Sequence, residues 1–351
     1  MTLAERARQI ADDVLFPAAQ DVDGAGRVPP RHLDLLAAEG FYGVAADPDL
    51  DLAGLGGVVA ALASGDLATT FVWIQHLTPV FALLRNEAEG TASELSKTWL
   101  PRLVAGEHRA GIAIAGIRPP TNYLRVRRSD GDFVLDGTAP WVTGWGMIDL
   151  VYVAARDPDD VVHFLLMDAV DQSVPSLRTE TQRLVAVQAS NTVNVTFDGH
   201  VVPGDRLVSS VPYATWRADD AGGSTLNGFL ALGVADRCVR LLRDGPSAAD
   251  AERLATEVDA CRVALITADS DSAPDARAAV SELAWRAAAT LTAWQGARAV
   301  LAANQAQRLV REATFTMVFG SRPVIRDALL HRLYRSAPLR DLGIGGAASS
   351  T

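Results

Sequence analysis

The chain has few cysteines. Its 351 residues include only Cys238 and Cys261, which lie in stretches of helical periodicity and lack the close spacing of metal ligands. The sequence therefore predicts no zinc or other metal site. Two separate thiols also favour a reducing compartment, so we expect the protein to be cytoplasmic.

The chain also lacks an excess of positive charge. It has 32 Lys and Arg residues against 42 Asp and Glu residues, which gives a formal net charge of −10. Such an acidic chain has no overall attraction for nucleic acid or for an anionic membrane surface, and we expect neither as a partner. The first residues, MTLAERARQIADD, contain no long apolar run, so we expect no signal peptide.

A membrane span is not expected either. Residues 67–84, LATTFVWIQHLTPVFALL, carry no formal charge and match a short span in length. Gln75, His76 and Pro79, however, lie in the middle of this stretch, where polar groups and a helix breaker are costly in lipid. We therefore expect two buried helices that are broken at the proline.

Three segments with different patterns are present. The length of the chain favours two or three packed units, and 49% apolar residues suffice for a large core. Residues 1–105 have helical periodicity, which predicts an N-terminal α-helical domain. Apolar residues recur at that spacing at Leu3, Ala7, Ile10, Val14 and Ala18.

The pattern changes over residues 106–212. This segment contains short runs rich in β-branched residues, such as LVYVAAR and NTVNVTFDGHVVP. Turn signals, including Asp130-Gly131 and Asp198-Gly199, separate or end these runs. The segment is therefore predicted to form a central antiparallel β-domain.

Residues 213–351 have helical periodicity again. The stretch 273–320 is too long for one unbroken helix in a compact domain, so we expect a break near Gly296 or Ala302. The last residues, GIGGAASST, predict a mobile tail. The predicted fold class is thus α+β multidomain, with an N-terminal helical domain, a central antiparallel β-domain and a C-terminal helical bundle.

Three phrases, which follow the family's order along the chain, resemble the acyl-CoA dehydrogenase superfamily, including its flavin monooxygenase branch. WLPRLVAGEHRAGIAIA resembles the family's link from helices to strands, and NTVNVTFDGHVVPGDRLV resembles its strand ending V-x-F-D-x-V-x-V-P. GDFVLDGTAPWVTGW resembles its strand pair G-x-x-L-N-G-x-K-x-W-I-T-N. The resemblance covers nearly the whole chain and implies the acyl-CoA dehydrogenase-like fold with FAD as cofactor.

Two tryptophans lie four residues apart in APWVTGW, residues 139–145, although only 6% of the chain is aromatic. Core packing would explain them, whereas the resemblance implies that Trp141 and Thr143 face the flavin ring. Strand alternation would place both side chains on one face, as stacking and hydrogen bonding to one ring require. Trp145 lies in a glycine-rich turn and is either a core residue or a pocket wall.

The loop after the first strand departs from the family. Where the family has T-E-P-x-x-G-S-D, this chain has AGIRPPTN. Ala115 stands where the family's threonine contacts the flavin, and it offers only backbone N–H groups. Thr121 and Asn122 replace the Ser-Asp pair that meets the acyl-CoA. Arg118 is new, and it either faces a phosphate or carboxylate of the substrate or is a solvated loop residue.

The family's catalytic glutamate is also absent. Most family dehydrogenases carry it near the C-terminus in a phrase like Y-E-G-T, and the best match here, LYRSA, has Arg335 at that place. A minority carry it at the start of the C-terminal domain, where the nearest carboxylates are Asp219 and Asp220. A carboxylate is needed to accept a proton from carbon. This pair either supplies it or is a solvated helix flank.

Four more residues belong to the candidate site. Phe319 and Gly320 lie about where the family's glycine-rich turn approaches the flavin, with a helix break as the alternative. His76 is a candidate acid–base group because the family's corresponding helix borders the acyl channel, with a satisfied core histidine as the alternative. Asn227 is either a helix cap or a substrate contact.

These departures leave three interpretations open. The first is an FAD-dependent oxidoreductase that dehydrogenates an acyl-CoA or acyl-carrier thioester at its α,β bond. The second is a flavin-dependent monooxygenase, which needs no glutamate base. The third is a non-catalytic partner subunit of a heteromeric acyl-CoA dehydrogenase. The apolar C-terminal helices predict a homo-oligomer, a dimer or tetramer, with a hetero-oligomer containing an active paralogue as the alternative.

Overall fold

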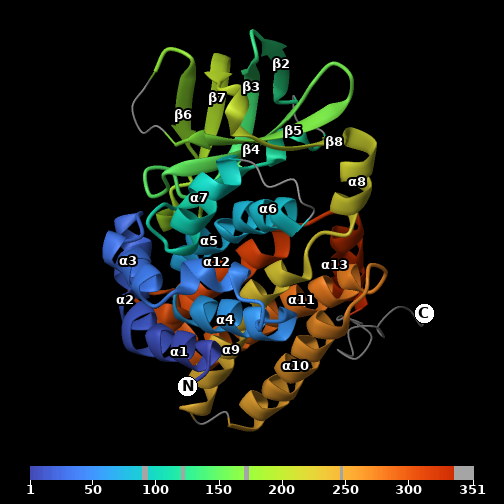
Figure 1. Ribbon diagram of the computed structural model, residues 1–351. Helices are drawn as coiled ribbons and strands as arrows, with labels where there is room; N and C mark the ends of the chain where they lie inside the picture. Colours follow the sequence, from blue (N-terminus) through green and yellow to red (C-terminus); the bar gives the residue numbers. More distant parts are fainter. Residues whose placement is uncertain (89–93, 120–122, 170–173, 246–247, 336–351) are drawn as a thin grey trace, which may run out of the picture.

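The computed structural model describes the chain except for residues 89–93, 120–122, 170–173, 246–247 and 336–351. A β-sheet lies at one end of the molecule, and helices from both ends of the sequence form a bundle at the other (Figure 1). The predicted α+β architecture is therefore confirmed. The tail that we expected to be mobile falls in 336–351, outside the described residues.

The N-terminal segment is helical, as its periodicity predicts. Its helices are α1 (Leu3–Ile10), α2 (Phe16–Ala25), α3 (Pro30–Ala38), α4 (Leu52–Gly65), α5 (Leu67–Gln75), α6 (Leu77–Ala88) and α7 (Glu94–Val104), and a π-helical turn (Ala11–Leu15) joins α1 to α2. A capping box starts α1, because Thr2 and Glu5 each accept a hydrogen bond from the other's backbone N–H. Asp51 and Asp66 cap α4 and α5 with their carboxylates.

The apolar stretch 67–84 forms two helices, but the break differs from the prediction. It lies at His76, between α5 and α6, whereas Pro79 is in the first turn of α6. Proline is tolerated there because the first turn of a helix has no intrahelical partner for its N–H groups. Residues Leu67–Ala88 are long and apolar enough to cross a membrane, yet most of them are buried inside the protein.

The sheet is mostly antiparallel. Its strands are β1 (Ala110–Ala113), β2 (Arg125–Ser129), β3 (Asp132–Val142), β4 (Leu150–Arg156), β5 (Val161–Asp168), β6 (Leu177–Thr181), β7 (Val193–Val202) and β8 (Leu207–Pro212). The order is β6-β7-β3-β2-β4-β5-β8, and β1 pairs with β4 in parallel. Asp130 and Gly131, both with positive φ, form the two-residue turn that joins β2 to β3.

The C-terminal segment adds six helices to the described structure. They are α8 (Tyr213–Ala221), α9 (Gly228–Arg243), α10 (Ala248–Thr267), α11 (Ala273–Gln295), α12 (Gln305–Val318) and α13 (Pro323–Arg335). The predicted break in the long stretch is confirmed, because α11 ends at Gln295 and the next residue, Gly296, has a φ of 61°.

One apolar core joins the two helical segments. At its centre α4 packs against α9, and a Cβ at Gly233 would lie 2.4 Å from the carbonyl oxygen of Ala60. Only glycine permits that approach, which brings the N-terminal helix α4 into close contact with the C-terminal helix α9. Two further apolar clusters cover opposite faces of the sheet, and α6 and α7 contribute to one of them. The sheet is thereby fixed to the helical bundle.

Candidate functional site

The tryptophan predicted to face the flavin lies near the end of β3, in an unusual backbone conformation. Trp141 has a φ of 62°, and the ladder between β3 and β7 shifts register between Ala139 and Val142. Its side chain is 56% exposed. Thr143, by contrast, is 2% exposed, just beyond the strand. The expectation that regular alternation places the two side chains on one face is wrong, because the irregularity re-aims Trp141.

The hydroxyl of Thr143 is engaged inside the protein. Its Oγ1 lies 3.1 Å from Oγ1 of Thr192, which lies 2.8 Å from Oγ of Ser190. All three side chains are buried. Trp145 is 4% exposed and belongs to the apolar cluster on the sheet, so it is a core residue. Of this stretch, only Trp141 presents an open aromatic surface.

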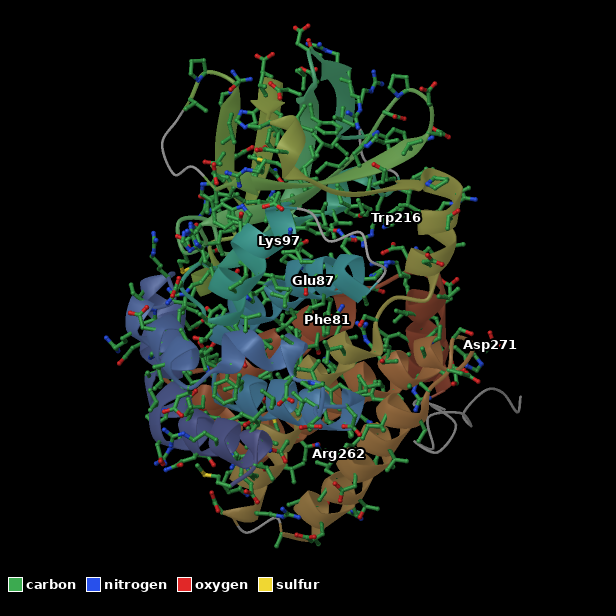
Figure 2. All side chains as sticks on the ribbon, in the orientation of Figure 1. Phe81, Glu87, Lys97, Trp216, Arg262 and Asp271 are labelled. Carbon is green, nitrogen blue, oxygen red and sulfur yellow. The ribbon has the colours of Figure 1, made fainter. Side chains whose placement is uncertain are left out.

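The loop after β1 contains an arginine with a firm anchor. Ala115 begins a short 3-10 turn, Ala115–Ile117, and Arg118 follows it. The guanidinium of Arg118 donates to both carboxylate oxygens of Asp220, at 2.9 and 2.5 Å, and lies 5.6 Å from the ring centroid of Trp216. Trp216 itself lies on α8, beside the sheet (Figure 2). The alternative of a solvated loop arginine is therefore wrong. Thr121 and Asn122 lie outside the described residues.

The two aspartates near the end of α8 differ in environment. Asp219 is exposed. Asp220 is half-buried and bound by two guanidinium groups, because Arg322 also donates to its two oxygens, each at 2.8 Å. Burial raises the pKa of Asp220, but hydrogen bonds and charges from Arg118 and Arg322 outweigh it, so its pKa is below the ordinary value. Asp220 is thus a poor proton acceptor, and it is not a solvated helix flank.

His76 is a core residue with both ring nitrogens occupied. Its Nε2 lies 3.1 Å from the carbonyl oxygen of Leu103, and its Nδ1 accepts from the N–H of Ala110 at 3.1 Å. Tyr42 packs edge-on against the imidazole. Burial lowers the pKa of His76 to about 3, so the ring is neutral at physiological pH. These contacts fit the alternative of a satisfied core histidine that joins α5 to the start of the sheet.

The turn between α12 and α13 holds Phe319 and Gly320. Phe319 packs edge-on against Phe71, with ring centroids 4.7 Å apart, and Gly320 has a φ of 57°. Asn227 is the N-cap residue of α9, but its side chain makes no capping hydrogen bond. Its Nδ2 lies close to Gly320, where an added Cβ would be 3.1 Å away. The structure thus brings Phe319, Gly320 and Asn227 together.

An arginine that the sequence did not single out holds this turn. Arg277 on α11 is 2% exposed and donates to the carbonyl oxygens of Ser224, at 2.6 Å, and Phe319, at 3.2 Å. Burial, followed by the charge of Arg322, lowers the pKa of Arg277 to about 10. Its partners are about 40 to 50 residues away in the chain, so no local pattern indicated this role.

Arg335, which we matched to the family's glutamate, is the last residue of α13. The structure does not describe its side chain.

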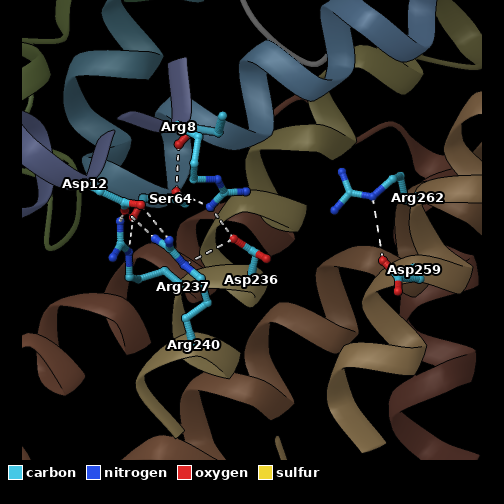
Figure 3. A network of polar contacts seen from close by, with 9 residues as sticks. Arg8, Asp12, Ser64, Asp236, Arg237, Arg240, Asp259 and Arg262 are labelled. Atoms are coloured by element: carbon cyan, nitrogen blue, oxygen red, sulfur yellow. Dashed lines mark hydrogen bonds and ion pairs between the residues drawn. The ribbon is translucent and has the colours of Figure 1, made fainter. Parts of the chain in front are cut away.

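Other arginines, Arg237 and Arg240 on α9, bind the carboxylate of Asp12 from the first helices (Figure 3). With Arg243 they line a cleft of about 380 Å³. Burial lowers the pKa of Arg237 to about 10.

A second cleft lies in the sheet domain, where the sequence gave no signal. It measures about 480 Å³ and is lined in part by Tyr123, Arg125, Arg127 and Arg156. The guanidinium of Arg156 lies 4.9 Å from the ring centroid of Tyr123.

Within the described residues, no group of three or more His, Cys, Asp or Glu side chains is placed to hold a metal ion.

Comparison with known proteins agrees with this architecture. No protein-family model matches the chain. It is 26% identical over 214 residues to a probable acyl-CoA dehydrogenase, fadE25, of Mycobacterium leprae, a match that covers 57% of this chain and 54% of the relative. It is 25% identical over 224 residues to the mitochondrial short-chain specific acyl-CoA dehydrogenase of Bos taurus, covering 59% and 52%. The chain thus spans about half the length of these curated relatives.

Solved structures match over a larger part of the chain. A glutaryl-CoA dehydrogenase of Mycobacterium smegmatis in complex with FADH2 superposes with a TM-score of 0.79 at 16% identity, covering 96% of this chain and 95% of that one. Butyryl-CoA dehydrogenase of Megasphaera elsdenii superposes with a TM-score of 0.77 at 16% identity, covering 95% and 97%. The chain thus has the fold of the acyl-CoA dehydrogenases, and it is similar in sequence to curated acyl-CoA dehydrogenases over about half of their length.

Proposed function

We propose that the protein is an FAD-dependent oxidoreductase of the acyl-CoA dehydrogenase type that acts on an acyl thioester. The observation that carries the proposal is the open indole of Trp141, 56% exposed at the irregular end of β3. The fold that contains this strand supports the proposal, because butyryl-CoA and glutaryl-CoA dehydrogenases share it and the latter was solved with FADH2. An exposed aromatic face beside a buried core is suited to cover a flat ring.

Part of the candidate site fits such a cofactor. Trp141 would cover one face of the isoalloxazine, and the chemistry supplied by FAD is acceptance of a hydride from the substrate. Thr143 does not offer a free hydroxyl, since Thr192 engages it, and Ala115 has none. Polar contacts to the ring at these positions would therefore come from backbone groups. Arg237 and Arg240 are held by Asp12 and are not proposed to bind the diphosphate.

The proposed reaction also needs a proton acceptor, for which the described residues offer less support than for flavin binding. Dehydrogenation of a thioester requires a group that accepts the proton from the α-carbon. His76 and Asp220 are engaged by other groups, as described above, which leaves the exposed Asp219 among the candidates with described side chains. This observation favours a second candidate function, a flavin monooxygenase or a non-catalytic partner subunit, in which no such base is needed.

The proposed partners follow from the same reasoning. The substrate would be an acyl-CoA or an acyl-carrier thioester, handled by a homo-oligomer in the cytoplasm, or by a hetero-oligomer if the chain serves an active paralogue. Trp285 and Trp294 on α11 are about 40% exposed and offer an apolar surface for such an assembly.

The test is anaerobic flavin reduction. The purified full chain is loaded with FAD, and its absorbance is recorded while saturated acyl-CoAs of increasing length are added. Bleaching of the flavin by one of them supports the dehydrogenase. Asp219→Asn would then test the base, with Asp220→Asn in parallel. A flavin that stays oxidised with every acyl-CoA would contradict dehydrogenation, and failure to bind FAD at all would contradict both flavin functions.

A further inference from the structure

A serine, a histidine and an aspartate form a hydrogen-bonded chain at one margin of the sheet. Oγ of Ser210 on β8 lies 2.8 Å from Nδ1 of His163 on β5, directly across the strand pair. Nε2 of the same imidazole lies 2.9 Å from Oδ2 of Asp157, just after β4. A nucleophile within hydrogen-bond reach of a base, itself oriented by a third group, is the geometry of an activated nucleophile.

The carboxylate fixes the tautomer of the imidazole. Oδ1 of Asp157 accepts from the N–H groups of Asp159 and Val161, both at 2.9 Å, which leaves Oδ2 directed at His163. A carboxylate oxygen is an acceptor, so Nε2 carries the proton and Nδ1 presents its lone pair to Ser210. In this tautomer the hydroxyl of Ser210 donates to the imidazole, as it must before a general base can take its proton.

The histidine and the serine differ in exposure, as such an arrangement requires. His163 is 8% exposed and packs beside the ring of Phe133, with centroids 5.4 Å apart. Ser210, in contrast, is exposed. β8 is an edge strand of the described sheet, so the backbone N–H groups on its outer side have no strand partner there. The base is thus held in place, while the serine that carries the hydroxyl is exposed at the edge of the sheet.

The same sheet contains a matched pair that lacks the third group. Oγ of Ser176 lies 3.0 Å from Nδ1 of His200, nearly the same contact as between Ser210 and His163. Among the described residues, no carboxylate is hydrogen-bonded to His200. Ser176–His200 therefore represents an ordinary polar contact in this protein, against which Ser210 can be compared without any mutation.

We infer that Ser210 is a nucleophile for acyl transfer, with His163 as its general base and Asp157 as the residue that positions the base. The ligand class is an activated acyl ester or thioester. The oxygen of Ser210 bonds to the acyl carbon while its proton passes to Nδ1 of His163. The bond to the alcohol or thiol then breaks, and the leaving group takes that proton. Water repeats the sequence and releases the carboxylic acid. This activity is independent of the flavin function.

The test uses the full chain without FAD and two probes, a fluorophosphonate and p-nitrophenyl acetate. Mass spectrometry of proteolytic peptides locates the adduct, and its rate of formation is measured for the unmodified protein, Asp157→Asn, His163→Gln and Ser176→Ala. We expect the adduct on Ser210. Both changes in the relay are expected to slow it about 100-fold, the typical contribution of general-base catalysis.

The matched pair decides the interpretation. We expect Ser176 to stay unlabelled in the unmodified protein and Ser176→Ala to label Ser210 at the normal rate. Asp157→Asn places an amide N–H against Nε2 and turns the lone pair of His163 away from Ser210, so its effect reports the tautomer. No adduct on Ser210, equal labelling of Ser176, or a rate that His163→Gln leaves unchanged would each overturn the inference. Melting curves show which variants remain folded, and the Ser176 comparison requires none.

Discussion

Replacement of Asp220 by asparagine tests the ion cluster that connects three parts of the chain. Asp220 on α8 accepts four N–H groups within 2.9 Å, two from Arg118 in the loop after β1 and two from Arg322 before α13. Asparagine retains the shape of the side chain but removes its charge. It also turns an NH2 group toward one of the guanidinium groups, so two cations lose their shared counter-ion.

The expected loss of stability follows from the burial of the three side chains. Removing one partner of a buried ion pair costs ~3–5 kcal/mol, because the remaining charge is left uncompensated. Here the side chains of Asp220, Arg118 and Arg322 are 17%, 27% and 16% exposed, so water screens part of that charge. We therefore expect Asp220→Asn to lower the free energy of unfolding by about 2–3 kcal/mol.

The assay is urea unfolding followed by tryptophan fluorescence, which includes Trp216 beside Arg118. Asp219→Asn is the matched control, since the neighbouring aspartate is exposed and is expected to change stability by less than about 0.5 kcal/mol. The reasoning is refuted if Asp220→Asn is as stable as the unmodified protein, or if Asp219→Asn loses as much.

The pH dependence gives a second test of the same cluster. Arg118 and Arg322, acting against burial, lower the pKa of Asp220 in the folded protein below that of the unfolded chain. A carboxylate with a lowered pKa contributes stability above its unfolded pKa, about 3.9, and loses it as pH falls through the folded pKa. The difference between the unmodified protein and Asp220→Asn should therefore be constant above about pH 5 and shrink below pH 4.

Three other outcomes are expected. Trp141→Ala should weaken FAD retention by at least about 1 kcal/mol with little loss of stability, measured as flavin occupancy after gel filtration, whereas Trp285→Ala should retain full occupancy. Burial raises the pKa of Glu312 to about 7 despite its ion pair with Arg308. Glu312→Leu should lower the free energy of unfolding by ~3–5 kcal/mol, measured by chemical denaturation, because it leaves the buried charge of Arg308 unpaired. The double variant with Arg308→Met should lose less. Light scattering should give a dimer or tetramer, and a monomer at micromolar concentration would contradict an assembly through α11.

Local patterns were sufficient for the architecture. Helical periodicity and β-branched runs distinguish the three segments because those patterns reflect burial on one side of an element. The turn at Asp130-Gly131 and the break at Gly296 were also predictable, since both need a backbone with positive φ, which glycine adopts without strain.

The site was less predictable, because its geometry depends on contacts between distant residues. The alternation argument failed at Trp141, where a register shift between β3 and β7 cannot be read from β3 alone. The sequence alone leaves Arg118 either a substrate contact or a solvated residue, since its partner Asp220 lies 102 residues further along the chain. For His76 the sequence offered both a core histidine and an acid–base group, because its carbonyl partner, Leu103, is 27 residues away.

The positive φ at Trp141 belongs to the site proposed for the cofactor, and it also lowers the stability of the protein. A residue with a Cβ pays roughly 1–2 kcal/mol to adopt a φ near 62°, whereas glycine adopts it freely. Selection for heat resistance alone would therefore favour Trp141→Gly, which removes the strain along with the exposed ring. A screen for thermostable variants that also scores flavin retention would separate the two pressures. If glycine is recovered at position 141 only when flavin retention is not scored, the residue there lowers stability and supports ligand binding.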